Sequence, residues 1–161
     1  VVYRSSRAEA DAVVTAIEAG GHAARALGAD LSDPGACDRV VAETVSAFGR
    51  LDVLVNMASV YRATPADQLT VADWDAALAV DLRAAWLCAR AAVPQMRRQG
   101  GGRIVNITTI GAKQPGAGSM PTTLSRAAGI VVTKSLSKEF AKASHIATQA
   151  GVVSWERGIA H

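Results

Sequence analysis

The sequence predicts an α/β fold, in which a parallel sheet is sandwiched between helices. Short apolar runs rich in Val and Ile alternate at least three times with longer segments of helical periodicity along the 161 residues. The connections are short, as expected for right-handed βαβ units. Half of the residues are hydrophobic but only 4% are aromatic, so we expect a core built from Ala, Val, Leu and Ile.

The first half of the chain predicts two strands, each followed by a helix. A short β-branched and aromatic run at residues 1–3 precedes apolar residues that recur at helical spacing from Arg7, until Gly20 ends them. Residues 22–28 are compatible with a modest strand. After a turn with a capping residue ahead of a proline, a second helix ends at Gly49.

The second half contains the two most apolar strand candidates, residues 51–56 and 103–108. Runs this continuous are typical of strands covered on both faces, so we expect both to be central in the sheet. A long helix at residues 70–98, capped at its N-terminus, lies between them. A further helix at residues 121–143 begins with Pro121, which suits a first helical position.

Composition argues against several classes of protein. The net charge of +3 is scattered, with no run of five like charges, so we expect no nucleic-acid partner and no polybasic membrane surface. Cys37 and Cys88 lack CxxC spacing and are expected to be reduced core residues, and the three histidines form no ligand cluster with them. No apolar run approaches the ~18 residues of a membrane span. We therefore expect a cytoplasmic protein with no metal site.

Candidate ligand positions follow the predicted strands, because open parallel sheets bind ligands at the carboxyl ends of their strands. Polar or small residues occur after the apolar runs at four places: residues 4–7, 30–32, 56–59 and 108–110. At the start of the last helix, Thr122 and Arg126 place a hydroxyl beside a cation one turn apart. This pair is either a proton-transfer site, the remnant of one, or a helix start with a solvated arginine.

The chain resembles the short-chain dehydrogenase/reductase family. The resemblance covers residues 1–141 and depends on six signatures in the family's order: YRSS, AxxADLSDP, FGRLDVLVNMAS, ADWDAALAVDLRAAW, GGRIVNITT and LSRAAGIVVTKSLSKEFA. It implies a Rossmann-like three-layer sandwich that binds NAD(P) and transfers hydride to or from a small carbonyl or alcohol substrate. With the apolar runs, the family's strand order also implies that residues 53–55 and 104–107 lie in adjacent central strands. The identity of that substrate is not readable from these residues.

The chain departs from the family pattern at both ends. The family's first βα unit carries a TGxxxGxG loop that cradles the cofactor pyrophosphate, and this loop is absent here. Since the chain starts with Val1, at what corresponds to the second strand, we expect a truncated piece of a longer domain. Residues 142–161 lack both period-2 alternation and the family's RVNxxxPG, so we expect a partial domain at residues 1–141 and a divergent tail without the sixth strand.

The resemblance also assigns four catalytic positions, and all four are substituted. Asp81 replaces the asparagine and Thr109 the serine of the usual tetrad, while Thr122 and Arg126 replace the Tyr and Lys of YxxxK. A threonine hydroxyl is shorter and far less acidic than a phenol, so it cannot act as the general acid. Arginine stays charged and cannot shuttle a proton. We therefore expect no activity from this chain.

The cofactor preference implied by the resemblance is NADP, with weak or lost binding. An acidic residue after the second strand selects NAD in this family, whereas this chain has Arg4, Ser5 and Arg7, which suit a 2′-phosphate unless they form only a solvated helix start. The resemblance places four further residues beside the adenine and ribose: Asp30, Leu31, Asn56 and Ala58.

Two functions follow. The first is an NADP-dependent oxidoreductase homologue whose activity is lost in this chain. The alternative is a non-catalytic fragment or a subunit that forms a homodimer through the helices at residues 70–98 and 121–143, a pairing common in the family.

Overall fold

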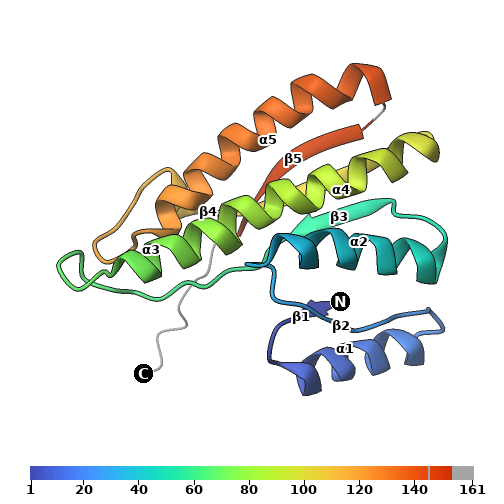
Figure 1. The fold of residues 1–161 in the computed structure, drawn as a ribbon, viewed down its shortest axis with the longest axis horizontal. Helices are drawn as coiled ribbons and strands as arrows, with labels where there is room; N and C mark the ends of the chain where they lie inside the picture. The colour runs from blue at the N-terminus through green and yellow to red at the C-terminus, as the bar shows by residue number, and fades with distance from the viewer. Residues whose placement is uncertain (145, 154–161) are drawn as a thin grey trace.

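A computed structural model describes residues 1–144 and 146–153. Strands and helices alternate along the chain, and the colours in Figure 1 follow them from the N-terminus to the C-terminus. The elements are β1 (Val2–Tyr3), α1 (Arg7–Ala19), β2 (Leu27–Gly28), α2 (Pro34–Phe48), β3 (Val53–Asn56), α3 (Val71–Ala77), the π-helix η1 (Leu78–Arg83), α4 (Ala84–Arg98), β4 (Gly102–Thr109), the 3₁₀-helix η2 (Ile110–Ala112), α5 (Thr122–Ser144) and β5 (Ile146–Val153).

The described strands form two parallel sheets, which confirms the α/β, Rossmann-like fold class. One sheet has the order β1-β2 and the other the order β3-β4-β5. In Figure 1, the smaller sheet and α1 lie at one end of the molecule, and α5 with β5 lies at the other. Val53 pairs with Arg103 and Asn56 with Asn106, so the predicted adjacency of β3 and β4 is also confirmed. β3 is nevertheless an edge strand of its sheet, and only β4 is central.

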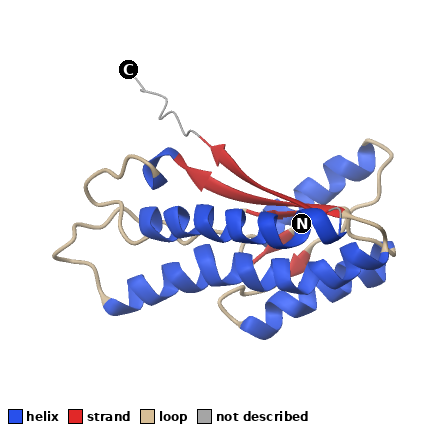
Figure 2. Ribbon diagram, turned by 90° about the horizontal axis from the view of Figure 1, so that it is seen from above, coloured by secondary structure: helices blue, strands red, loops and turns tan. Residues whose placement is uncertain are grey.

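The expectation that residues 142–161 contain no strand is wrong for their described part. α5 continues to Ser144, and Ile146–Val153 forms β5. This strand pairs in parallel with β4 over its whole length, from Gly102↔Ile146 to Thr109↔Val153. Figure 2 shows the two strands running side by side in one direction. The segment lacks an alternating pattern because backbone hydrogen bonds to β4, rather than side-chain periodicity, define it as a strand.

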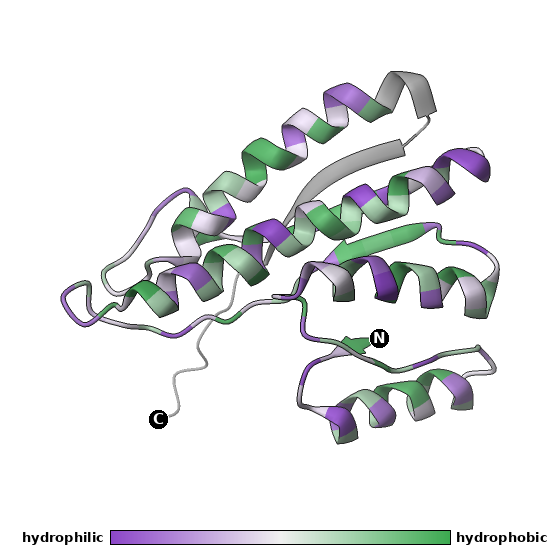
Figure 3. Cartoon of the chain, viewed as in Figure 1, coloured by the Kyte–Doolittle hydropathy of each residue, from purple (hydrophilic) through white to green (hydrophobic). Residues whose placement is uncertain are grey.

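A second correction concerns β3, which the sequence predicted to be covered on both faces. Val53 and Val55 are 50% and 48% exposed. Their shared orientation follows from the two-residue period of a strand, so one whole face of β3 is uncovered. Figure 3 shows this strand as hydrophobic along most of its length. The apolar run correctly predicted the strand, but the described residues supply no cover for this face.

The predicted helix at residues 70–98 exists as three consecutive segments, α3, η1 and α4. Its N-terminus has a capping box, in which the Asp73 N–H donates to Thr70 Oγ1 (3.1 Å) and the Thr70 N–H donates to Asp73 Oδ2 (3.2 Å). The π-helix then widens one turn, a feature often found at functional sites. This turn carries Asp81, which is 3% exposed.

The core of the described chain lies between helices α2 and α4 and the strand β4. Ala89, Ala92, Met96 and Ile104 are each fully buried there. Cys37 and Cys88 are also buried, and neither takes part in a disulfide bond. Burial, followed by the proximity of Cys37, raises the pKa of the Cys88 thiol to about 12.

The described part of the chain shows neither a membrane-spanning helix nor a cluster of metal-ligating side chains. No helix there is long and apolar enough to cross a membrane. Nor do three His, Cys, Asp or Glu side chains come together there as metal ligands would.

Candidate functional site

Arg126 occupies the centre of a polar cluster at the carboxyl ends of β3 and β4. It lies in the second turn of α5 and is 6% exposed. Its Nη1 donates to the carbonyl of Ile107 at 2.8 Å, and its Nη2 donates to the carbonyl of Ala58 at 2.7 Å. The guanidinium therefore ties the end of β4 to the loop that follows β3. Short charge-assisted bonds of this kind are among the stronger hydrogen bonds in proteins.

Asp81 supplies the counter-charge for Arg126. Its Oδ1 lies 3.7 Å from Arg126 Nη2, and the two side chains are 0% and 7% exposed respectively. The carboxylate also accepts hydrogen bonds from the Val60 N–H (3.3 Å) and from Ser125 Oγ (3.1 Å). A buried charge needs such partners, because an unpaired one would lose its hydration without compensation.

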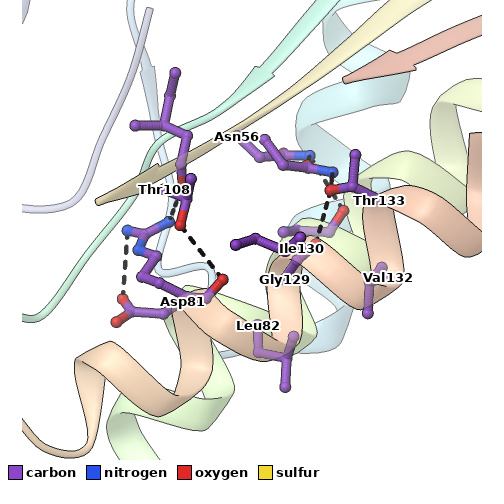
Figure 4. Close-up of a pocket in the computed structure, with 12 residues that line it drawn as sticks. Asn56, Asp81, Leu82, Thr108, Gly129, Ile130, Val132 and Thr133 are labelled. Atoms are coloured by element: carbon purple, nitrogen blue, oxygen red, sulfur yellow. Dashed lines mark hydrogen bonds and ion pairs between the residues drawn. The ribbon is translucent and has the colours of Figure 1, made fainter. Parts of the chain in front are cut away.

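A second set of hydrogen bonds continues this cluster between β3, β4 and α5. Asn56 Nδ2 donates to Asn106 Oδ1 at 2.8 Å, and Asn106 Nδ2 donates to Thr133 Oγ1 at 2.9 Å. Figure 4 shows Asp81 and Thr108 on one side of the pocket here, and Asn56 and Thr133 on the other. The cavity among these residues measures only about 10 Å³, which is space for about one water molecule. The cluster is therefore filled by its own side chains.

Thr122 and Thr109 complete the four tetrad positions without joining the ion pair. Thr122 begins α5, one residue later than predicted for that helix, and is 6% exposed. Its hydroxyl makes no hydrogen bond within the described residues, although its carbonyl accepts one from Ser125 Oγ at 2.8 Å. Thr109 ends β4 and is half-buried. The structure thus brings Asp81 and Arg126 into contact and leaves the two threonine hydroxyls outside this contact.

A larger cavity of about 430 Å³ lies next to this cluster. Four segments line it: the end of β1, the loop after β3, the helix α3 and the start of α5. Arg4 and Thr122 are the two predicted site residues on its wall. The remaining lining residues are Ser59, Val60, Tyr61, Arg62, Thr64, Leu69, Asp73, Ala76, Ala77 and Pro121.

The other predicted cofactor residues near the first sheet line neither of these cavities. Arg7 forms an exposed ion pair with Asp11 one turn further along α1, at 3.2 Å. Hydrogen bonds from Ser32, the first from its backbone N–H at 2.9 Å, hold the pKa of Asp30 below its usual value, and the charge of Arg4 adds a smaller effect. Ser5 is exposed. Leu31 packs against the core instead.

Sequence reasoning did not select Arg62 and Tyr61, which the structure places on the wall of the larger cavity. Both side chains belong to the loop after β3, between Asn56 and the cap of α3. The available signal was their position, since loops after the carboxyl ends of parallel strands commonly carry ligand-binding residues.

The sequence matches the family model described as short chain dehydrogenase over residues 1–154. It is 35% identical over 141 residues to a 3-oxoacyl-[acyl-carrier-protein] reductase of Synechocystis, covering 88% of this chain and 57% of the relative. It is 37% identical over 132 residues to the (2S)-[(R)-hydroxy(phenyl)methyl]succinyl-CoA dehydrogenase subunit BbsD of Thauera aromatica, covering 82% of this chain and 53% of that relative. The chain thus spans little more than half the length of these two relatives.

Solved structures give the same picture. A short chain dehydrogenase from Burkholderia cenocepacia, in complex with NADP, superposes with a TM-score of 0.87 at 37% identity, over 92% of this chain and 60% of that one. A dehydrogenase/reductase from Sinorhizobium meliloti superposes with a TM-score of 0.89 at 34% identity, over 95% of this chain and 60% of that one.

Proposed function

This chain belongs to the short-chain dehydrogenase family, and on that premise we propose that it is an NADP-type carbonyl or alcohol oxidoreductase homologue that does not catalyse hydride transfer as this chain. The observation that carries the proposal is the buried ion pair between Asp81 and Arg126. These residues stand at the tetrad positions of an asparagine and a lysine, according to the resemblance. Both are committed to protein partners here.

Arg126 is unsuited to the part that a lysine plays at this position. A lysine ammonium can lower the pKa of a neighbouring phenol and pass on a proton, whereas a guanidinium keeps its proton at all accessible pH values. The two terminal nitrogens of Arg126 also donate hydrogen bonds to the carbonyls of Ile107 and Ala58. It has therefore become a structural cation.

Thr122 cannot supply the missing general acid. Its hydroxyl is a neutral donor and acceptor that does not ionise near neutral pH, and its side chain is shorter than a tyrosine's. The cation next to this position, Arg126, is directed to Ile107 and Ala58 rather than to the Thr122 hydroxyl. Proton transfer to a carbonyl oxygen thus has no donor at either YxxxK position.

The side chains of this chain suit the 2′-phosphate end of NADP but not the end that would lie near Ala58 and Arg126. Arg4 is exposed and lies on the wall of the larger cavity, so its guanidinium is free to bind the 2′-phosphate. At the other end, the carbonyl of Ala58 and the side chain of Arg126 are already bonded to each other. We therefore propose weak binding with a preference for NADPH over NADH.

A homodimerising subunit is the second candidate function. Trp86 on α4 is 43% exposed, and Leu124 and Val131 on α5 are 45% and 64% exposed. Large apolar side chains exposed on two neighbouring helices favour a protein–protein contact there.

Fluorescence titration with NADPH and NADH tests the cofactor proposal, and NADPH oxidation with a panel of ketones tests the activity. We expect weak NADPH binding that Arg4→Gln reduces, and no turnover above background. Arg25→Gln, which changes an exposed arginine outside the cavity, is the matched control. Tight NADH binding, or turnover by the unmodified chain, would show the proposal to be wrong.

A further inference from the structure

Cys37 and Cys88 are the two cysteines of the chain, and they belong to one buried cluster although they lie on different helices. Cys37 is on α2 and 0% exposed, and Cys88 is on α4 and 3% exposed. The two helices pack against each other, and they lie side by side in Figure 1. Neither thiol lines either cavity of the candidate site, so the pair is a separate feature of the fold.

Two contacts fix the register of α4 against α2 on either side of the cysteines. Arg83 Nη2 donates to the carbonyl of Ser32 at 2.8 Å, just ahead of α2, and Arg90 Nη2 donates to Asp38 Oδ1 at 3.5 Å. These contacts join residues that are 51 and 52 apart in the sequence. The two cysteines are also 51 residues apart. The register that both contacts set therefore places one thiol opposite the other.

The two thiols also interact with each other. Cys37 Sγ donates to the carbonyl of Leu31 at 3.6 Å, which leaves its sulfur lone pairs available to accept a hydrogen bond from Cys88. Burial raises the pKa of the Cys37 thiol, and the side-chain hydrogen bond with Cys88 lowers it by a smaller amount. For Cys88, burial and then the proximity of Cys37 both raise the pKa. A thiolate at Cys37 is therefore the one that its neighbour stabilises.

We propose that Cys37 and Cys88 are a site of reversible oxidation, at which a disulfide bond forms between α2 and α4. Hydrogen peroxide is the oxidant, since a molecule this small reaches buried thiols through a local opening of the fold. Cys37 lies one turn after the N-cap Asp33, and helix ends open more readily than helix interiors. Cys37 is therefore the sulfur that reacts first.

The oxidation proceeds in two balanced steps. In the first, the Cys37 thiolate attacks one oxygen of the peroxide, the O–O bond breaks, and a sulfenic acid and hydroxide form. The proton lost from the thiol neutralises this hydroxide to water. In the second, the Cys88 sulfur attacks the Cys37 sulfur, the S–O bond breaks, and a second water molecule leaves. Two thiols and one peroxide thus become one disulfide and two water molecules. None of these steps depends on the proposed function.

The disulfide should stabilise the folded chain. It closes a loop of about 50 residues, which restricts the unfolded state more than the folded one. We expect the urea midpoint of the oxidised chain to exceed that of the reduced chain by about 1–2 M. A crosslink that forces the two helices out of their packing would instead lower the midpoint.

Peroxide treatment of the 161-residue chain tests the proposal. Exposed Met57 and Met120 also take up oxygen, so free thiols are counted in urea, and the crosslink is located by mass spectrometry of peptides prepared without reductant. We expect the number of free thiols to fall from two to none, with one peptide pair that links Cys37 to Cys88. Dithiothreitol should restore both thiols. The urea midpoint is compared before and after dithiothreitol, which leaves methionine sulfoxide unchanged in both samples.

Two single variants determine the order of the steps. Cys88→Ala should stop at the sulfenic acid of Cys37, which dimedone captures. Cys37→Ala should react more slowly with the same peroxide, because Cys88 lies within α4 rather than near a helix end. Unreacted thiols, a disulfide only between two chains, oxidation to sulfinic acids without a crosslink, or a lower urea midpoint in the oxidised chain would overturn the proposal. Faster capture in Cys37→Ala than in Cys88→Ala would overturn the assignment of Cys37 as the first sulfur to react.

Discussion

At the scale of single residues, the buried ion pair of Asp81 and Arg126 organises the candidate site. Asp81 and Arg126 are buried together, and between them they hold Ile107, Ala58 and Val60. Such a pair contributes little net stability when it forms, since both ions lose their hydration. Breaking it by removing one partner is costly, because the other charge then stays buried without compensation. We therefore expect the contributions of Asp81 and Arg126 to stability to be coupled.

A double-mutant cycle measures this coupling. We expect Asp81→Asn to lower the free energy of unfolding by about 3 kcal/mol, because it removes the counter-charge of a buried guanidinium. Arg126→Lys should also destabilise the chain, since an ammonium cannot span both carbonyls as a guanidinium does. The double variant should lose less than the sum of the two losses, as measured by urea unfolding.

The exposed ion pair between Arg50 and Asp52 provides the control for that cycle. Its atoms lie 2.7 Å apart, but its side chains are 66% and 54% exposed. Asp52→Asn should leave the urea midpoint unchanged, as for most surface pairs. Additive losses in the cycle, or an Asp81→Asn variant as stable as Asp52→Asn, would contradict the coupling.

The raised pKa of the Cys88 thiol predicts that the folded state loses stability at alkaline pH. Its pKa is raised to about 12 in the folded chain, while an unfolded cysteine titrates near ~8.5. As the pH rises, the thiol therefore ionises first in the unfolded state, which stabilises that state. The contribution of Cys88 to the free energy of unfolding is full below pH ~8.5 and is lost as the pH rises towards 12. We expect the melting temperature to fall less steeply between pH 8 and pH 11 in Cys88→Ala than in the parent chain. Parallel curves would contradict this assignment.

Among the elements, the rod of α3, η1 and α4 positions Asp81 for its ion pair. The capping box starts this rod, and the π-helical turn carries Asp81 towards α5, where Ser125 and Arg126 meet it. An N-cap determines where a helix begins, and hence which residues share its buried face. The Thr70 capping box therefore helps to position Asp81, because it fixes where α3 begins.

Thr70→Ala should lower the free energy of unfolding by about 1 kcal/mol, the usual cost of losing a threonine N-cap. Thr70→Ser should retain most of the stability, because its hydroxyl can accept the same hydrogen bond from the Asp73 N–H. The control is Thr15→Ala within α1, where the hydroxyl only donates back to the Asp11 carbonyl. Urea unfolding of the three variants checks this, and equal losses for Thr70→Ala and Thr15→Ala would refute a capping role.

At the scale of the whole molecule, the described strands form two sheets with free edges at β1 and β3. The exposed Val53 and Val55 belong to one of these strands. The chain spans 57% of the Synechocystis relative and 60% of the Burkholderia structure.

Restoring the family residues in the 161-residue chain is expected not to restore activity. We expect the variant Asp81→Asn, Thr109→Ser, Thr122→Tyr and Arg126→Lys to oxidise no NADPH with ketones or quinones. A tyrosine beside a lysine can donate a proton, but hydride transfer also needs the nicotinamide held about 3–3.5 Å from the substrate carbon. Grafting a first βα unit with TGxxxGxG onto this variant is the matched comparison. Turnover without the graft would show that the four substitutions alone limit the reaction.

The sequence by itself determined the α/β class and the positions of most elements, and its resemblance to a family determined the expected pairing of β3 with β4. Periodicity, caps and apolar runs are local properties, so they are readable without coordinates. The resemblance to the family, rather than periodicity, selected Asp81, Thr122 and Arg126 as candidate residues, and the absence of a proton donor among them stays a prediction.

Only the tertiary structure decided how those residues are used. It joined Asp81 to Arg126, placed Arg62 on the wall of the larger cavity, formed β5 against β4 and left one face of β3 exposed. Each of these depends on contacts between segments distant in the sequence. The physical reason is that hydrogen bonding and burial at such contacts are set by what packs nearby, which no local pattern encodes.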